Sequence, residues 1–145
     1  MKTMKLFFVA IVSTLVLPAC AERDRIITIS ELPATAQAFL KNFSDKQVSF
    51  AKIEREGLGK EYDVVFTDGS TVEFNSDGLW HDINCRNSAV PANAVPAQIK
   101  DYVKKNYSNV QIRQIEQFRN GYEIDLSNGL ELKFDKKFRI KDIDN

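Results

Sequence analysis

The feature of this sequence that most constrains its fold is an internal repeat. Short segments of similar residues recur at a spacing between 60 and 64 residues. A fixed period of this kind indicates a duplicated structural unit. We therefore predict that residues 22–86 and 87–145 are two copies of one unit, which together form one compact domain. The matching segments include Leu32-Pro33-Ala34 with Val95-Pro96-Ala97, Ile53-Glu54 with Ile115-Glu116, Tyr62-Asp63-Val64 with Tyr122-Glu123-Ile124, and Val72-Glu73-Phe74 with Leu132-Lys133-Phe134.

Each copy begins with a helical pattern and continues with a pattern of period two. Pro33 and Pro96 suit the first turn of a helix, and apolar residues then recur at helical spacing. Downstream, Asp68-Gly69 and Asn128-Gly129 are strong hairpin signals, because both residue types tolerate a positive φ. We predict an α+β fold: a tandem repeat of a helix plus a four-stranded antiparallel β-meander, with the helices on one face of the sheet.

The loop at Asp68-Gly69 determines which residues face each other. A three-residue loop, residues 67–69, places Val64 opposite Val72 and Tyr62 opposite Phe74. A two-residue loop would instead place an aspartate opposite Phe74. Only the longer loop sorts all apolar side chains to one face, and a one-residue slip would expose the whole set. We therefore predict the three-residue loop here and at the matching loop of the second copy.

The opposite face of the predicted sheet is polar and is the candidate binding face. Its members are Asp63, Glu73, His81, Glu123, Asp125, Glu131 and Lys133. The register makes Asp63 and Glu73 cross-strand partners, and likewise Asp125 and Glu131. Like charges in direct opposition destabilise a sheet, and a cation such as calcium would relieve them; the alternative is that water screens both pairs. Trp80 faces Phe74 in the core if its turn contains a bulge, and otherwise joins Glu73 on the open face.

The first 21 residues are typical of an export signal. Lys2 and Lys5 precede an apolar stretch at residues 6–17, which is too short to cross a bilayer permanently. Two cleavage sites overlap. Ala19-Cys20-Ala21 fits release of the chain, whereas residues 17–20 resemble a lipobox, in which Cys20 would be lipidated. We expect an exported protein that is periplasmic, or anchored to the outer membrane or cell surface if Cys20 carries lipid.

Charge and cysteine content narrow the function further. Without the two lysines of the signal, 18 basic residues stand against 20 acidic ones, which argues against a nucleic-acid-binding module. Either cleavage leaves Cys85 as the one thiol of the mature chain, and we predict that it is a small buried apolar residue. We expect Glu22–Arg25 to be a short spacer if Cys20 carries lipid and a frayed terminus otherwise, and we expect Lys141–Asn145 to fray.

No constellation of reactive residues is evident. Hydrolysis by an activated nucleophile needs a nucleophile, a base and a group that orients the base. His81 is the single histidine, and its neighbour Asp82 would point to the other face of a strand. One histidine and one mature cysteine are also too few for a zinc site. We predict a protein that is not an enzyme and that has no cofactor and no metal centre.

Several segments resemble the PepSY-like, β-lactamase-inhibitor-like family of bacterial envelope proteins. The resemblance covers residues 26–144. It implies a periplasmic or surface location, a fold of helices on a sheet, and a concave sheet that clasps another protein. It implies no catalytic or inhibitory residues. The segments that carry it are the export signal, Leu32-Pro33-Ala34, residues 62–69, the strand from Trp80 to Ile83, residues 89–92 and residues 126–134.

The leading hypothesis is a non-catalytic exported protein that binds another envelope or secreted protein through the open sheet face. A narrower form of this hypothesis is that the partner is a hydrolase, which the protein inhibits. The inhibitory role rests on fold-level analogy. The alternative is a module that binds a small ligand or a calcium ion through the acidic residues of that face. A third reading is an oligomer joined through free strand edges or Cys85. We expect no nucleic-acid partner, and membrane contact only through lipid on Cys20.

Overall fold

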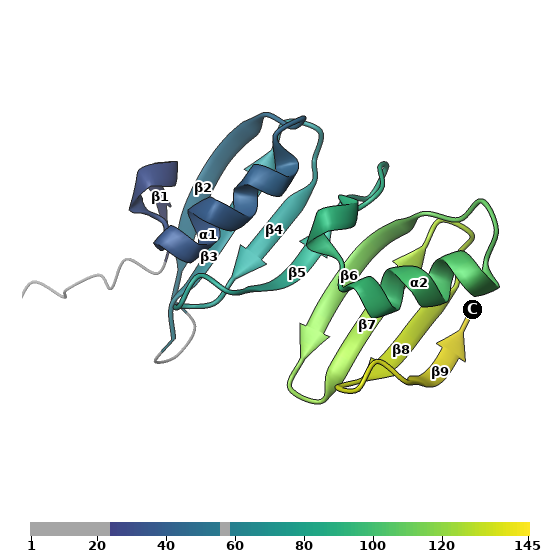
Figure 1. The fold of residues 1–145 in the computed structure, drawn as a ribbon. Coiled ribbons are helices and arrows are strands. Elements are labelled where there is room, and N and C mark those ends of the chain that lie inside the picture. Colours follow the sequence, from purple (N-terminus) through teal and green to yellow (C-terminus); the bar gives the residue numbers. More distant parts are fainter. Residues whose placement is uncertain (1–23, 56–58) are drawn as a thin grey trace, which may run out of the picture.

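The computed structural model describes residues 24–55 and 59–145, and in these residues the chain forms one antiparallel sheet of nine strands in sequence order (Figure 1). The predicted signal at residues 1–21, including Cys20, lies outside the described residues. The strands are β1 (Asp24–Ile27), β2 (Val48–Glu54), β3 (Glu61–Phe66), β4 (Thr71–Phe74), β5 (Trp80–Asn84), β6 (Ile112–Phe118), β7 (Gly121–Leu126), β8 (Glu131–Asp135) and β9 (Ile140–Asp144). The helices are α1 (Ala34–Phe39) and α2 (Ala97–Asn106), with 3-10 turns η1 (Ile29–Glu31), η2 (Leu40–Phe43) and η3 (Ala92–Ala94).

The predicted fold class is wrong. The structure is mostly β, with α-helices of only six and ten residues, and is not a tandem repeat of a helix plus four strands. Two features account for the difference. β1 adds a ninth strand to the eight that were predicted, within one sheet that the β5–β6 pair joins. Near residue 40, α1 tightens into the 3-10 turn η2, which limits helix content further.

The predicted register of the hairpins is confirmed. Val64 lies opposite Val72 and Tyr62 opposite Phe74, as the three-residue loop requires. In the second half, Ile124 lies opposite Leu132 and Tyr122 opposite Phe134. Gly69 and Gly129 have φ of +83° and +88°, so the loops use the left-handed conformation that glycine adopts at low cost.

The apolar side chains of this register form a row across one face of the sheet. All six members of the row are fully buried, and each faces the next on the adjacent strand: Val64, Val72, Ile83, Ile115, Ile124 and Leu132. Both α-helices lie over this face, α1 in front of β2–β4 and α2 in front of β7 and β8 (Figure 1). Burial of each such side chain stabilises the fold by about 1.5–3 kcal/mol. In the part of the chain that the structure describes, the opposite face of the sheet carries no helix.

The two outermost strands correct the expectation of frayed ends. Asp24 lies opposite Glu54, and Ile27 lies opposite Ala51. The described part of the stretch that was expected to fray, Asp24 and Arg25, therefore joins the sheet. At the other edge Ile143 lies opposite Leu132, within β9. The hydrogen bonds between strands join backbone N–H and C=O groups. Charged side chains therefore do not prevent a segment from forming an edge strand.

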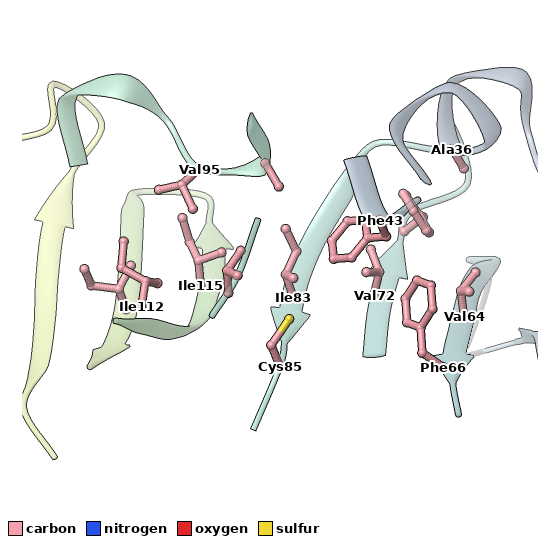
Figure 2. Close-up of a cluster of buried hydrophobic side chains, with 14 of the residues drawn as sticks. Ala36, Phe43, Val64, Phe66, Val72, Ile83, Cys85, Val95, Ile112 and Ile115 are labelled. Atoms are coloured by element: carbon pink, nitrogen blue, oxygen red, sulfur yellow. The ribbon is translucent and has the colours of Figure 1, made fainter. Parts of the chain in front are cut away.

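A bulge in the β4–β5 pair settles the position of Trp80. The register shifts between Glu73 and Phe74, so Trp80 lies opposite Phe74. Its ring stacks on Phe39 of α1 with a centroid distance of 6.0 Å. Trp80 therefore packs against the core, as the bulged alternative predicted. Cys85 is buried, as predicted, and this burial raises the pKa of its thiol (Figure 2).

Candidate functional site

The open face of the sheet carries a row of carboxylates on five adjacent strands, which we call the acidic row. Its members are Asp63 on β3, Glu73 on β4, Asp82 on β5, Glu116 on β6 and Glu123 on β7. Each lies directly opposite the next in the strand register. The row alternates with the buried apolar row, because successive side chains of a strand point to opposite faces. The same pattern that builds the core therefore places these acids together on the open face.

A lysine limits the acidic row at each end. Lys52 on β2 lies opposite Asp63, with 3.1 Å between its Nζ and the Asp63 Oδ2, and it also contacts Glu54. At the other end, Lys133 on β8 lies opposite Glu123. Its Nζ is 2.8 Å from Glu131 Oε1, 2.9 Å from Asp144 Oδ2 and 4.0 Å from Glu123 Oε2. Lys133 is thus shared among three carboxylates.

In the described part of the chain, no lysine compensates the centre of the acidic row, where His81 is the nearby basic residue whose charge acts on the carboxylates. Among the described residues, no lysine or arginine lies within ion-pair distance of Glu73, Asp82 or Glu116. Partial burial raises the pKa of the Glu73 carboxyl, and the charges of Asp63 and Asp82 raise it further. Burial likewise raises the pKa of Glu116, with Asp82 and Glu123 adding to the effect. The centre of the row is therefore a site that gains from an external positive charge.

A hydrogen bond from a neighbouring strand restrains Asp82. Burial raises its pKa, although a hydrogen bond of 2.8 Å from Gln114 Nε2 to its Oδ1 opposes the shift. The same glutamine accepts a hydrogen bond of 3.0 Å from Asn84 Nδ2 at its Oε1. This amide network spans β5 and β6 and holds the Asp82 carboxylate in place on the open face.

The structure brings most of the predicted site residues onto this face. Asp63, Glu73 and Glu123 lie in the acidic row. Asp125 and Glu131 lie directly opposite each other in the neighbouring row, as predicted, and Lys133 ends the acidic row. Burial and the charge of Glu131 raise the pKa of Asp125.

His81 is the extra residue of the β4–β5 bulge, since Trp80 and Asp82 occupy the paired positions on either side of it. Its Nε2 lies 4.0 Å from Glu61 Oε1. This Nε2 is buried and has no hydrogen-bond partner among the described residues. His81 therefore lies at one end of β5, beside the acids of β3 and β4 rather than within the row.

Two members of the acidic row, Asp82 and Glu116, are absent from the predicted site. They face each other only because β5 pairs with β6, a contact between residues that are distant in sequence. The expectation that Asp82 points away from the open face is wrong, because the bulge at His81 shifts the alternation and places Asp82 opposite Glu73. No local pattern indicates the pairing that makes them neighbours.

Other kinds of site are not evident in the part of the chain that the structure describes. In residues 24–55 and 59–145, no group of three or more His, Cys, Asp or Glu side chains converges closely enough to hold a metal ion. Over the same residues, no helix has the length and apolar character needed to cross a membrane.

Comparisons with known proteins agree with this architecture. A family model described as "Putative beta-lactamase-inhibitor-like, PepSY-like" matches residues 60–142. Among solved structures, a "putative periplasmic protein" from Bacteroides vulgatus ATCC 8482 is 46% identical, with a TM-score of 0.81 over 86% of this chain and 99% of that one. No curated protein gives a significant match.

Two further solved structures are similar over nearly their whole length. A "putative calcium-regulated periplasmic protein" from Bacteroides thetaiotaomicron is 44% identical, with a TM-score of 0.82 over 86% of this chain and 99% of that one. A second "putative periplasmic protein" from Bacteroides vulgatus ATCC 8482 is 37% identical, with a TM-score of 0.77 over 84% and 99% of the two chains.

Proposed function

Because this chain belongs to the family described as "Putative beta-lactamase-inhibitor-like, PepSY-like", we propose that it is an exported, non-catalytic protein that binds another envelope or secreted protein. The three similar structures are all described as periplasmic proteins, which supports export. The binding surface is the acidic row on the open sheet face. The observation that carries the proposal is the uncompensated centre of that row, Glu73, Asp82 and Glu116.

Electrostatics define the partner. The pKa values of these three carboxyls are raised, which means that their ionised forms are disfavoured. A cationic group that approaches them stabilises the ionised forms, because each negative charge then has a counter-charge. Lys52 and Lys133 already pair with the carboxylates at the two ends, so the carboxylates without a lysine partner lie on the strands between them. A partner that presents arginine or lysine side chains along a line across the strands fits this pattern.

The spacing of the row favours a helical partner over an extended one. Neighbouring strands are about 4.8 Å apart, so five strands extend over about 19 Å. Side chains on one side of a helix repeat once per turn, about every 5.4 Å. Side chains on one side of an extended chain repeat at every second residue, about every 6.6 Å. Basic residues one helical turn apart therefore stay in register with more carboxylates than alternate residues of a strand.

Affinity capture from envelope extract tests this proposal. The bait is the mature chain, compared with the variant Glu73→Lys/Glu116→Lys. The matched control, Asp77→Lys/Asp101→Lys, makes the same change in net charge at exposed positions outside the row. We expect the wild type and the control to capture the same partner and the row variant to lose it. We also expect salt at about 1 M to abolish capture by the wild type, because charges are then screened within about 3 Å. Equal capture by all three baits would refute a role of the acidic row.

Inhibition of a hydrolase is a narrower form of the same proposal. It rests on the family description and on the open sheet face, and no residue of the acidic row is assigned an inhibitory role. If the captured partner is a hydrolase, its rate of substrate turnover in the presence of wild type and the row variant measures inhibition directly.

Calcium binding is the second candidate. A protein 44% identical to this chain is described as calcium-regulated, and the opposed pairs Asp63–Glu73 and Asp125–Glu131 supply oxygen ligands. Calorimetric titration with calcium compares the wild type with Asp63→Asn/Glu73→Gln and with Asp125→Asn/Glu131→Gln. If the wild type gives heat of binding and one double variant does not, the pair changed in that variant is the calcium site. Silence from the wild type removes this candidate and leaves protein binding untouched.

A further inference from the structure

A groove separate from the acidic row lies on the helix side of the sheet. It has a volume of about 500 Å³ and runs between α2, the linker at residues 89–95 and the segment that leads into β6. Binding sites for small molecules commonly have about 300–1,000 Å³. Four apolar side chains form its floor, each 9% exposed or less: Val90, Val95, Val103 and Ile112. Figure 2 shows Val95 and Ile112 within this part of the core.

The matching place in the first half of the chain is filled. There Phe43 is 2% exposed and its ring stacks on Phe66 at a centroid distance of 5.3 Å (Figure 2). The matching positions in the second half are Tyr107 and Leu126. Leu126 has no ring to stack, and Tyr107 is only half-buried and tilts against Tyr102 at 6.5 Å. The loss of one aromatic stack thus leaves room beside α2.

A second substitution between the halves keeps the groove apolar. Lys46 in the first half is tied to Asp68 and, at 2.9 Å, to Ser88 Oγ. The residue that precedes β6 at the matching position is Val110, which lines the groove. The location that two aromatic rings and a paired lysine fill in the first half is therefore an open groove with an apolar floor in the second.

The rim of the groove is positively charged. Lys100 and Lys104 lie one turn apart on α2 and both line the groove. Within the described residues, neither has a carboxylate at ion-pair distance. The groove thus combines an apolar floor with two ammonium groups on one side of its opening.

We propose that this groove binds a single-chain anionic amphiphile of the fatty-acid type. The hydrocarbon chain lies on the valines and Ile112, and the anionic head binds Lys100 and Lys104. The apolar floor excludes a purely polar anion, and the two lysines disfavour a cationic amphiphile. The site is independent of the acidic row, which is on the other face of the sheet.

Titration of the mature chain with monomeric dodecanoate, followed by calorimetry, tests the proposal. We expect dodecanoate to bind, dodecanol to bind about tenfold more weakly, and inorganic phosphate to give no heat, because both the head and the chain contribute. The variant Lys100→Gln/Lys104→Gln should weaken dodecanoate binding about tenfold and leave dodecanol binding unchanged. The control Lys105→Gln, on the same helix but outside the groove, should behave as the wild type.

A second pair of variants tests the location of the hydrocarbon chain. Ala92→Trp places a ring at the exposed mouth of the groove, whereas Ala97→Trp places the same ring on α2 outside it. We expect only the first variant to lose dodecanoate binding, with both unfolding at the wild-type denaturant concentration. Equal binding of dodecanoate by both variants, or binding of phosphate without binding of dodecanoate, would overturn the proposal.

Discussion

Asp82 on β5 lies directly opposite Glu116 on β6, at the strand pair that joins the two halves of the sheet. Two carboxylates in this arrangement repel each other, and the charge of Asp82 contributes to the raised pKa of Glu116. The pair makes the acidic row continuous across the molecule. The fold therefore maintains an electrostatically unfavourable contact at its centre, which is a common property of binding surfaces.

Removal of one charge from this pair should stabilise the protein. We expect Glu116→Gln to raise the free energy of unfolding by about 0.5–1 kcal/mol at neutral pH, because it removes a partly buried charge and its repulsion with Asp82 and Glu123. Urea denaturation measures the difference. Asp101→Asn, at an exposed position of α2, is the control and should change little. A Glu116→Gln protein less stable than the control would contradict the electrostatic account.

The whole acidic row should make stability fall as pH rises. Burial raises the pKa of each of these carboxyls, so between the usual and the raised values the folded state binds more protons than the unfolded state. Their contribution is complete below the usual pKa and is lost as pH rises through the folded-state pKa. We expect a larger free energy of unfolding at about pH 5 than at about pH 7.5. The groups are the five members of the acidic row, Asp63, Glu73, Asp82, Glu116 and Glu123, together with Asp125 of the neighbouring row.

A series of denaturation curves at constant ionic strength checks this slope. The double variant Glu73→Gln/Glu116→Gln should flatten it, because two of the titrating groups are gone. A slope of the opposite sign in the wild type, or an unchanged slope in the double variant, would show that other groups determine the pH dependence.

Lys46, whose side chain is 8% exposed, should determine how the free energy of unfolding changes at low pH. Burial alone would lower the pKa of Lys46, but the hydrogen bond and charge of Asp68 outweigh it and raise that pKa. In return, the Lys46 hydrogen bond lowers the pKa of Asp68 to about 2. The stabilisation by Asp68 is therefore present above its usual value of 3.8 and is lost as pH falls toward about 2.

We expect Lys46→Met to lower the free energy of unfolding by about 1–2 kcal/mol at neutral pH, since Asp68 and Ser88 lose a partner. Asp68 is partly exposed, so water replaces part of that interaction. The variant should also lose less stability than the wild type between about pH 4 and pH 2. Parallel acid-unfolding curves for the two proteins would count against the pairing.

A methyl group at Gly121 should disrupt the β7–β8 pair. A Cβ at this position would be 1.8 Å from the backbone carbonyl oxygen of Phe134. At Gly129 a Cβ would have no heavy atom within 4 Å. Alanine there would be destabilised only by adopting the left-handed φ of +88°. We expect Gly129→Ala to cost about 1 kcal/mol and Gly121→Ala several times more. Thermal unfolding of both variants measures the contrast, and equal costs would contradict the predicted clash.

Local patterns in the sequence correctly predicted which residues face each other within hairpins. Side chains alternate with a period of two, so a choice of loop length at Asp68-Gly69 fixed the pairs Val64–Val72 and Tyr62–Phe74. The open-face positions of Asp63, Glu73 and Glu123 followed from the same alternation. These relationships depend on residues close together in the chain, and a single sequence contains them.

Repeat matching by residue letters gave one misleading result. The segment Ile53-Glu54 looks like Ile115-Glu116, but the strand register places Glu116 opposite Glu123 and Lys52 opposite Asp63. The position of Glu116 is therefore equivalent to that of Lys52. A basic residue in one half and an acidic one in the other leaves the centre of the acidic row uncompensated.

The sequence by itself determined the alternation of apolar and polar side chains, the loops that set hairpin register and the burial of Cys85, because these depend on local backbone geometry and on the exclusion of apolar groups from water. Only the tertiary structure decided that β1 joins the sheet, that β5 pairs with β6 and that Asp82 meets Glu116. Backbone hydrogen bonds between strands carry no side-chain signature. Strands that are distant in sequence therefore pair according to how the helices and the apolar row pack together.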